Sequence, residues 1–149
     1  MTITKIAALA AGTALLGACA TAQETLVENV DDTYTAYLTG DKVPGGGDMD
    51  GYARAEVTVS GTLDRVCYEI DEVRGVVPTA AHIHEGNEGQ TGRPVVTLED
   101  NDGTWSGCVN SDGPVRDHIE RMPSMHYVQI HTAEYPNGAI RGQLYDYDN

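Results

Sequence analysis

Short runs of alternating apolar and polar residues, broken by turn-forming residues, limit what this chain can fold into. Tyr34, Ala36 and Leu38 alternate with more polar neighbours, and the same period of two returns at 55–59 and 66–70. This period places every second side chain on one face of a β-strand. Gly, Pro, Asn and Asp separate the runs, as they do in strands joined by turns. The pattern predicts an all-β domain.

Eight segments carry this strand signal. They are 34–38, 55–59, 66–70, 79–84, 94–98, 104–109, 127–131 and 140–145. A glycine- and proline-containing loop is expected at 40–51, and a helical turn at 115–121. Strands at this spacing predict a Greek-key or immunoglobulin-like β-sandwich of about eight antiparallel strands.

The N-terminal residues have the features of an export signal. Lys5 precedes an apolar run at 6–16, which is too short to span a bilayer, and small residues follow. Residues 16–19, Leu-Gly-Ala-Cys, resemble a bacterial lipobox. We therefore expect a lipoprotein signal peptide at 1–18, a lipid on Cys19 and anchoring to a membrane. The alternative is cleavage after Ala20 or Ala22 and simple secretion.

The mature protein is expected in the periplasm or at the cell surface, with the outer membrane favoured because Ala20 follows the lipid-bearing cysteine. Residues 19–32 are small, polar and acidic, which predicts a tether ahead of a single domain at 33–149. The formal charge is −14 at neutral pH. A surface this acidic repels phosphate, so nucleic acid is excluded as a partner; the sequence identifies no protein partner.

Three cysteines occur in the 149 residues. With Cys19 used for lipid, Cys67 and Cys108 remain as a pair in an oxidising compartment, where a disulfide is expected. The alternative is two free buried thiols.

Motifs in two segments, 80–96 and 127–144, resemble those of a known family. The first contains His-Ile-His-Glu-Gly and Gly-Arg-Pro-Val-Val, and the second contains Val-Gln-Ile-His-Thr and Ile-Arg-Gly-Gln-Leu. Together with 38–44 and 66–70 they resemble the CHRD (chordin) domain family. The resemblance implies an extracellular immunoglobulin-like or related β-sandwich and supplies no reaction. Growth-factor binding, a property of other modules in chordin-like animal proteins, is not expected here.

Strand alternation brings histidines together. His82 and His84 share one strand face, while Ala81 and Ile83 point into the core. His131 shares a face of another strand with Tyr127 and Gln129. If the two strands are neighbours, three imidazoles converge into a metal site, with copper the expected ion and zinc the alternative.

Four other residues are candidates around this site. His126 lies just ahead of the 127–131 strand and is a candidate fourth ligand, while His118 is a weaker one. Glu85 is expected to fix the tautomer of an imidazole as an outer-shell partner. For Arg141 we expect a structural ion pair, with a role facing the histidines as the alternative.

A looser likeness to Cu/Zn superoxide dismutase rests on the type and order of His82, His84 and His131. The second, zinc-binding cluster of that enzyme has no counterpart in the sequence, so dismutase activity is not expected. Three functions follow: metal binding; non-metal binding or adhesion with structural histidines; and, least favoured, an oxidoreductase of the superoxide dismutase type.

Overall fold

The computed structural model describes residues 31–146 and contains one continuous, antiparallel β-structure. Its elements are β1 (Asp32–Thr39), η1 (Gly40–Lys42), β2 (Tyr52–Ser60), β3 (Arg65–Arg74), β4 (Ala80–Glu85), β5 (Pro94–Leu98), β6 (Ser106–Asn110), α1 (Gly113–Arg121), η2 (Pro123–Met125), β7 (His126–His131), β8 (Ile140–Gln143) and β9 (Tyr145–Asp146). The predictions for the export signal, the lipid on Cys19 and nearly all of the tether lie outside the described residues.

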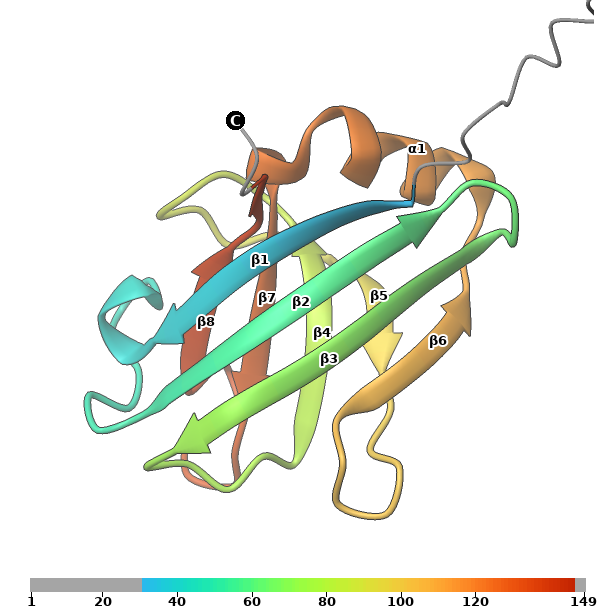
Figure 1. Cartoon of the computed structure of the whole chain (residues 1–149). Coiled ribbons are helices and arrows are strands. Elements are labelled where there is room, and N and C mark those ends of the chain that lie inside the picture. Colours follow the sequence, from blue (N-terminus) through green and yellow to red (C-terminus); the bar gives the residue numbers. More distant parts are fainter. Residues whose placement is uncertain (1–30, 147–149) are drawn as a thin grey trace, which may run out of the picture.

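The strands follow the order β5-β4-β7-β8-β1-β2-β3-β6, with β9 added beside β1. Figure 1 shows this path folded into two layers, with β1, β2, β3 and β6 in one and β8, β7, β4 and β5 in the other. The connections from β3 to β4, from β5 to β6 and from β6 to β7 cross between the layers. The result is a nearly closed sandwich, which confirms the predicted all-β fold.

Alternation along each strand fills the space between the layers. Ala36 and Leu38 of β1, Val57 of β2 and Val66 of β3 are completely buried. Ala81 and Ile83 of β4 meet Val128 and Ile130 of β7 across the ladder, and all four are also fully buried. The layers are held together by this apolar core, which leaves the polar residues of β4, β7 and β8 on the outer face.

Element boundaries differ from the sequence prediction at several places. The predicted strand 140–145 is divided at Leu144, whose backbone N–H turns to the carbonyl of His126 at 2.9 Å. The helical turn expected at 115–121 begins earlier, with Pro114 in the first turn, where proline loses no helical hydrogen bond. Strand β7 begins at His126, one residue before the prediction. This last difference matters for the site.

The disulfide prediction is confirmed. Cys67 of β3 and Cys108 of β6 lie directly opposite each other in the antiparallel ladder, with 3.9 Å between their Cα atoms and an S–S bond between them. A disulfide of this kind indicates an oxidising compartment, in agreement with a location outside the cytoplasm.

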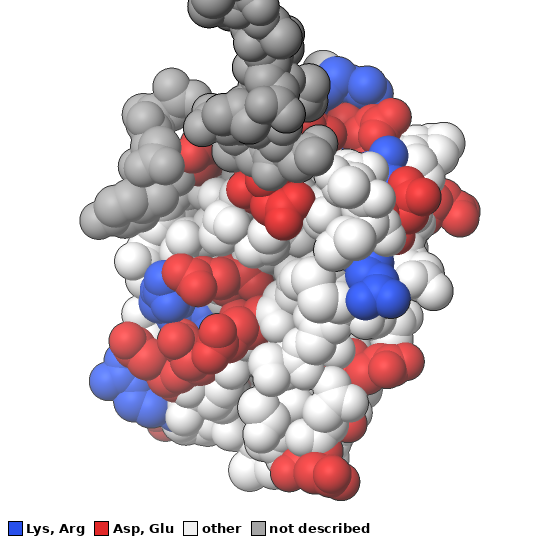
Figure 2. All heavy atoms as spheres, turned by 45° about the vertical axis from the view of Figure 1, so that its right-hand side comes forward, with Lys and Arg blue, Asp and Glu red and all other residues white. Residues whose placement is uncertain are grey.

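Acidic side chains are spread over the surface. On the face shown in Figure 2, the blue basic groups lie beside red acidic groups. Several basic side chains are paired with carboxylates, including Arg54 with Glu56 and Asp71, and Arg116 with Asp64 and Asp117. Within residues 31–146, the one α-helix is too short and too polar to cross a membrane.

Candidate metal centre

Strands β4 and β7 bring His82, His84 and His131 together on the outer face of their sheet. In the ladder His82 lies opposite Gln129, and His84 lies opposite Tyr127. His131, the last residue of β7, lies opposite Ala80 and therefore diagonally next to His82. The prediction that two distant stretches of chain place three imidazoles on one patch is confirmed.

The three rings are close enough to serve one ion. Ring centroids are 5.1 Å apart for His82 and His131, 5.7 Å for His82 and His84, and 6.0 Å for His84 and His131. One ring nitrogen of each lies within 4.8 Å of the others. Metal–imidazole bonds are about 2 Å long, so shifts of less than about 1 Å would bring these atoms onto one centre. The group could hold a metal ion.

Loop carbonyls fix the tautomers of two rings. Nδ1 of His84 donates to the carbonyl oxygen of Gly92 at 3.0 Å, and Nδ1 of His131 donates to that of Pro136 at 2.9 Å. A carbonyl only accepts, so the neutral ring carries its hydrogen on Nδ1 and keeps a lone pair on Nε2. Metal-ligating histidines are held in this way, with the second nitrogen bonded to a carbonyl or carboxylate.

One ring nitrogen of each histidine is buried and has no hydrogen-bond partner. These atoms are Nδ1 of His82, Nε2 of His84 and Nε2 of His131. A buried polar atom without a partner destabilises a fold by about 1–3 kcal/mol, and this cluster contains three. A metal ion bound to these nitrogens would give all three a partner at once, so the donor set fits a transition metal that prefers imidazole.

The comparisons with known proteins agree with the motifs in these strands. The family model described as the CHRD domain matches residues 34–144. The chain belongs to the CHRD domain family. No curated protein and no solved structure shows significant similarity to it.

Tyr127 supports the cluster from below the loop at 86–93. Its ring stacks on His84 with centroids 4.9 Å apart and planes within 10°. Its hydroxyl oxygen accepts a hydrogen bond from the backbone N–H of Gly92 at 3.0 Å. The carbonyl of the same glycine accepts the hydrogen bond from Nδ1 of His84. Any side chain at Gly92 would collide with the carbonyl of Glu85, so glycine is required at this close approach.

Replacing Tyr127 with phenylalanine is expected to lower the free energy of unfolding by about 1–3 kcal/mol, because the partly buried N–H of Gly92 loses its acceptor. Urea denaturation of the metal-free CHRD domain measures this change. Tyr52→Phe is the control, since it removes a hydroxyl from a partly exposed ring. Equal stability of the two variants would contradict the role assigned to the Tyr127 hydroxyl.

Burial favours the neutral form of two of the clustered imidazoles, those of His82 and His84. Desolvation lowers the pKa of His82, and the charge of a protonated His131 would lower it further. Desolvation also lowers the pKa of His84. The hydrogen bond to Gly92 raises that pKa in part, and the positive charge of Arg141 lowers it further. Neutral imidazole is the form that binds metals, so the lowered pKa values of His82 and His84 favour metal binding near neutral pH.

The same lowered pKa values predict how stability depends on pH. The folded metal-free domain binds fewer protons at His82 and His84 than the unfolded chain does, so their stabilising contribution is complete above the unfolded pKa of about 6.5. This contribution is lost as the pH falls from about 6.5 toward the pKa values of the two histidines in the folded state. The loss is at most about 1.4 kcal/mol for each histidine and each pH unit. Urea denaturation across this range measures the slope. The slope should be smaller in a His82→Ala, His84→Ala variant, and an equal slope would contradict this assignment.

His126, the predicted fourth ligand, requires correction. It lies in β7 rather than ahead of it, and alternation sends its side chain to the opposite face from His131. There it is almost completely buried, its Nδ1 donates to the carbonyl of Met122 at 3.0 Å, and its ring meets that of His118 at 4.9 Å. His118 is therefore also away from the cluster.

Glu85 requires the same correction. It lies opposite His126 in the ladder and not on the face of its neighbour His84. Its carboxylate pairs with Arg93 at 3.0 Å and lies 3.6 Å from Nδ1 of His118. The predicted outer-shell role belongs instead to two backbone carbonyls, those of Gly92 and Pro136.

Arg141 faces the outer side of the sheet, one strand beyond the cluster. Instead of the expected ion pair, its guanidinium donates to the carbonyls of Gln90 and Asn87 at 2.6 and 2.8 Å, and to Oε1 of Gln143 at 3.3 Å. It also lies 3.4 Å above the centroid of the Tyr127 ring. Because β4 and β8 flank β7, Tyr127 lies between His84 and Arg141.

The sequence prediction did not assign a role to Gln129 or Tyr127, although it placed both on the face of His131. Nε2 of Gln129 donates to the carbonyl of Asn137 at 2.9 Å and so holds the 132–139 loop, which also supplies the carbonyl that orients His131. Gly138, at φ 131°, lies against the Gln129 side chain. Strand alternation is the signal that could have identified this supporting layer.

Proposed function

We propose that this protein binds one copper ion through His82, His84 and His131 outside the cytoplasm. It stores or delivers that ion, or passes electrons through it. The proposal depends on one observation: three buried ring nitrogens, one from each histidine, have no hydrogen-bond partner. Loop carbonyls orient two of these three rings. Maintaining such a set of nitrogens without an ion is unfavourable.

Copper is favoured over zinc for two reasons. The group consists of imidazoles alone, and divalent copper binds nitrogen ligands more tightly than zinc does. Three protein ligands also leave further coordination positions for a second reactant, and His82 and His131 are only partly buried, so the cluster lies close to the surface. Reversible exchange of copper or electrons needs a centre near the surface.

The test is metal analysis of the purified full chain after loading with copper and removal of excess ion. The expected result is one copper per chain, retained against an equal concentration of zinc. Retention of zinc in place of copper would assign the same centre to the alternative metal. Absence of any stoichiometric metal would contradict the proposal.

The second candidate is a non-metal binding or adhesion module with structural histidines. It is favoured by the observation that His84 and His131 each hydrogen-bond a loop carbonyl, which is a structural role in itself. In that case the outer-face loops would contact the partner. Stoichiometric copper excludes this alternative as the full account of the cluster.

We further propose that Cys19 carries a lipid that anchors the protein to a membrane, with the outer membrane favoured. The support is the lipobox-like sequence before Cys19 and the disulfide in the domain that follows. Mass spectrometry of the native protein should show a lipid-modified N-terminal cysteine, and Cys19→Ala should move the protein from the membrane fraction to the soluble one. A soluble native protein cleaved after Ala20 or Ala22 would contradict lipid anchoring.

A further inference from the structure

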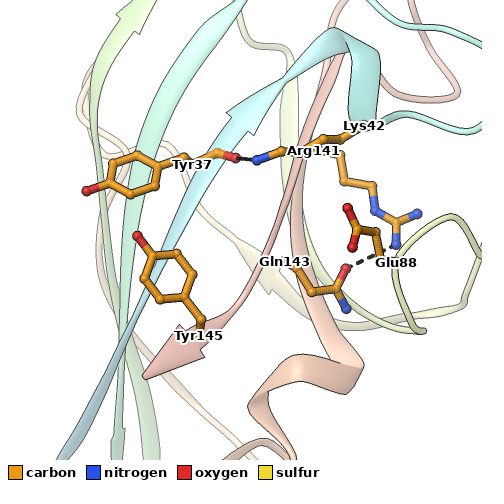
Figure 3. A pocket seen from close by; sticks show the side chains of 6 residues that line it. All are labelled: Tyr37, Lys42, Glu88, Arg141, Gln143 and Tyr145. Atoms are coloured by element: carbon orange, nitrogen blue, oxygen red, sulfur yellow. Dashed lines mark hydrogen bonds between the residues drawn. The ribbon is translucent and has the colours of Figure 1, made fainter. Parts of the chain in front are cut away.

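A cavity of about 120 Å³ lies on the outer face, on the other side of Arg141 from the histidine cluster. Its wall is formed by Tyr37, Lys42, Glu88, Arg141, Gln143 and Tyr145. Figure 3 shows these side chains coming from β1, η1, β8, β9 and the loop at 86–93. We propose that this cavity binds a small oxyanion, such as inorganic phosphate or a short carboxylate. The proposal goes beyond copper binding and does not depend on it.

The first argument is the buried charge of Arg141. Its side chain is 1% exposed, and its three hydrogen-bond acceptors are all neutral. By contrast, Arg54, Arg93 and Arg116 each contact a carboxylate. A buried cation that contacts no carboxylate is costly, and an anion in the cavity would provide a negative charge in direct contact.

The second argument is the orientation of the donors. Lys42 donates from Nζ to the carbonyl of Tyr37 at 2.7 Å, which fixes a second cation at the cavity wall. Gln143 donates from Nε2 to the carbonyls of Gly86 and Ser124 at 2.7 and 2.6 Å, so its oxygen faces Arg141. This arrangement holds the guanidinium in place before any ligand enters, which lowers the entropic cost of binding.

Glu88 is the one carboxylate among the six lining side chains, and it sets the direction of a test. Burial lowers the pKa of Arg141, and the negative charge of Glu88 opposes that shift. Glu88 therefore competes with an incoming anion. Neutralising Glu88 should strengthen anion binding, whereas neutralising Lys42 should weaken it. Opposite effects from two residues of the same cavity distinguish a binding site from a structural cluster.

The experiment uses the full chain depleted of metal, so that loss of the copper centre does not affect the result. Sodium phosphate and sodium acetate are titrated separately, and binding is followed by NMR shifts of the Arg141 and Gln143 side-chain N–H groups. We expect saturation with a Kd on the order of 1 mM for at least one anion. Tighter binding of phosphate assigns a dianion, and tighter binding of acetate assigns a carboxylate; both support the cavity.

Three variants make the result decisive. Lys42→Met is expected to weaken binding about fivefold and Glu88→Gln to strengthen it about fivefold, the size of one charge interaction at close range. Glu69→Gln, an exposed position on β3, changes the net charge equally but lies away from the cavity. The proposal is overturned if neither anion saturates below about 10 mM, or if Glu69→Gln and Glu88→Gln have the same effect.

Discussion

A His82→Ala, His84→Ala double variant is expected to lose stoichiometric copper, with an affinity more than about 100-fold lower than that of the native protein. Loss of an outer-shell partner alone lowers metal affinity by about 10–100-fold, and here two of the three ligands are removed. A single imidazole at His131 cannot chelate the ion. Isothermal titration with copper and metal analysis after desalting measure the change.

The chain offers a matched control for this variant. His118→Ala with His126→Ala also removes two histidines, but these lie on α1 and on the opposite face of β7, and neither joins the cluster. This control should retain one copper per chain, provided that circular dichroism shows the native fold. Equal loss of copper from both variants would mean that the histidines bind copper without regard to the geometry described above.

Removing the disulfide by Cys67→Ala and Cys108→Ala is expected to lower the free energy of unfolding by about 4 kcal/mol. The cysteines are 41 positions apart, and closing a loop of that length restricts the unfolded chain by roughly this amount on the entropic model. Strand β6 lies at the end of the strand order and hydrogen-bonds only β3 within that path, so the crosslink secures an edge.

Urea denaturation of oxidised native protein and of the variant measures this difference. Cys19→Ala is the control, because it removes a cysteine outside the disulfide and should leave the free energy of unfolding unchanged. The loop closed by the disulfide contains β4 with His82 and His84, so the variant should also lose copper at lower urea concentrations. A difference of less than about 1 kcal/mol would contradict the stabilising role of the crosslink.

The central geometry of the site could be predicted from sequence because it depends on strand alternation. His82 and His84 share a face in any β-strand, and the apolar positions Ala81 and Ile83 identify which face is outside. The proximity of His131 required only that β4 and β7 be neighbours, which they are. The same logic covers the fold, since alternation and turn residues identified the strands.

The errors arose where a strand begins or ends. His126 was placed ahead of β7 and Glu85 beside His84, but both residues lie within paired strands and point to the opposite face. Strand limits depend on hydrogen bonds to distant partners, so local sequence does not determine them. The partners of Arg141 show the same limitation, because the carbonyls of Asn87 and Gln90 are supplied by a loop more than fifty residues away.

The most direct test of the account is diffraction from crystals of the copper-loaded protein, measured on both sides of the copper absorption edge. One anomalous peak is expected among His82, His84 and His131, about 2 Å from a ring nitrogen of each. Nδ1 should be the ligand atom for His82, and Nε2 for His84 and His131, since these are the buried nitrogens without partners. A peak beside His118 and His126, or no ordered copper at all, would contradict the account.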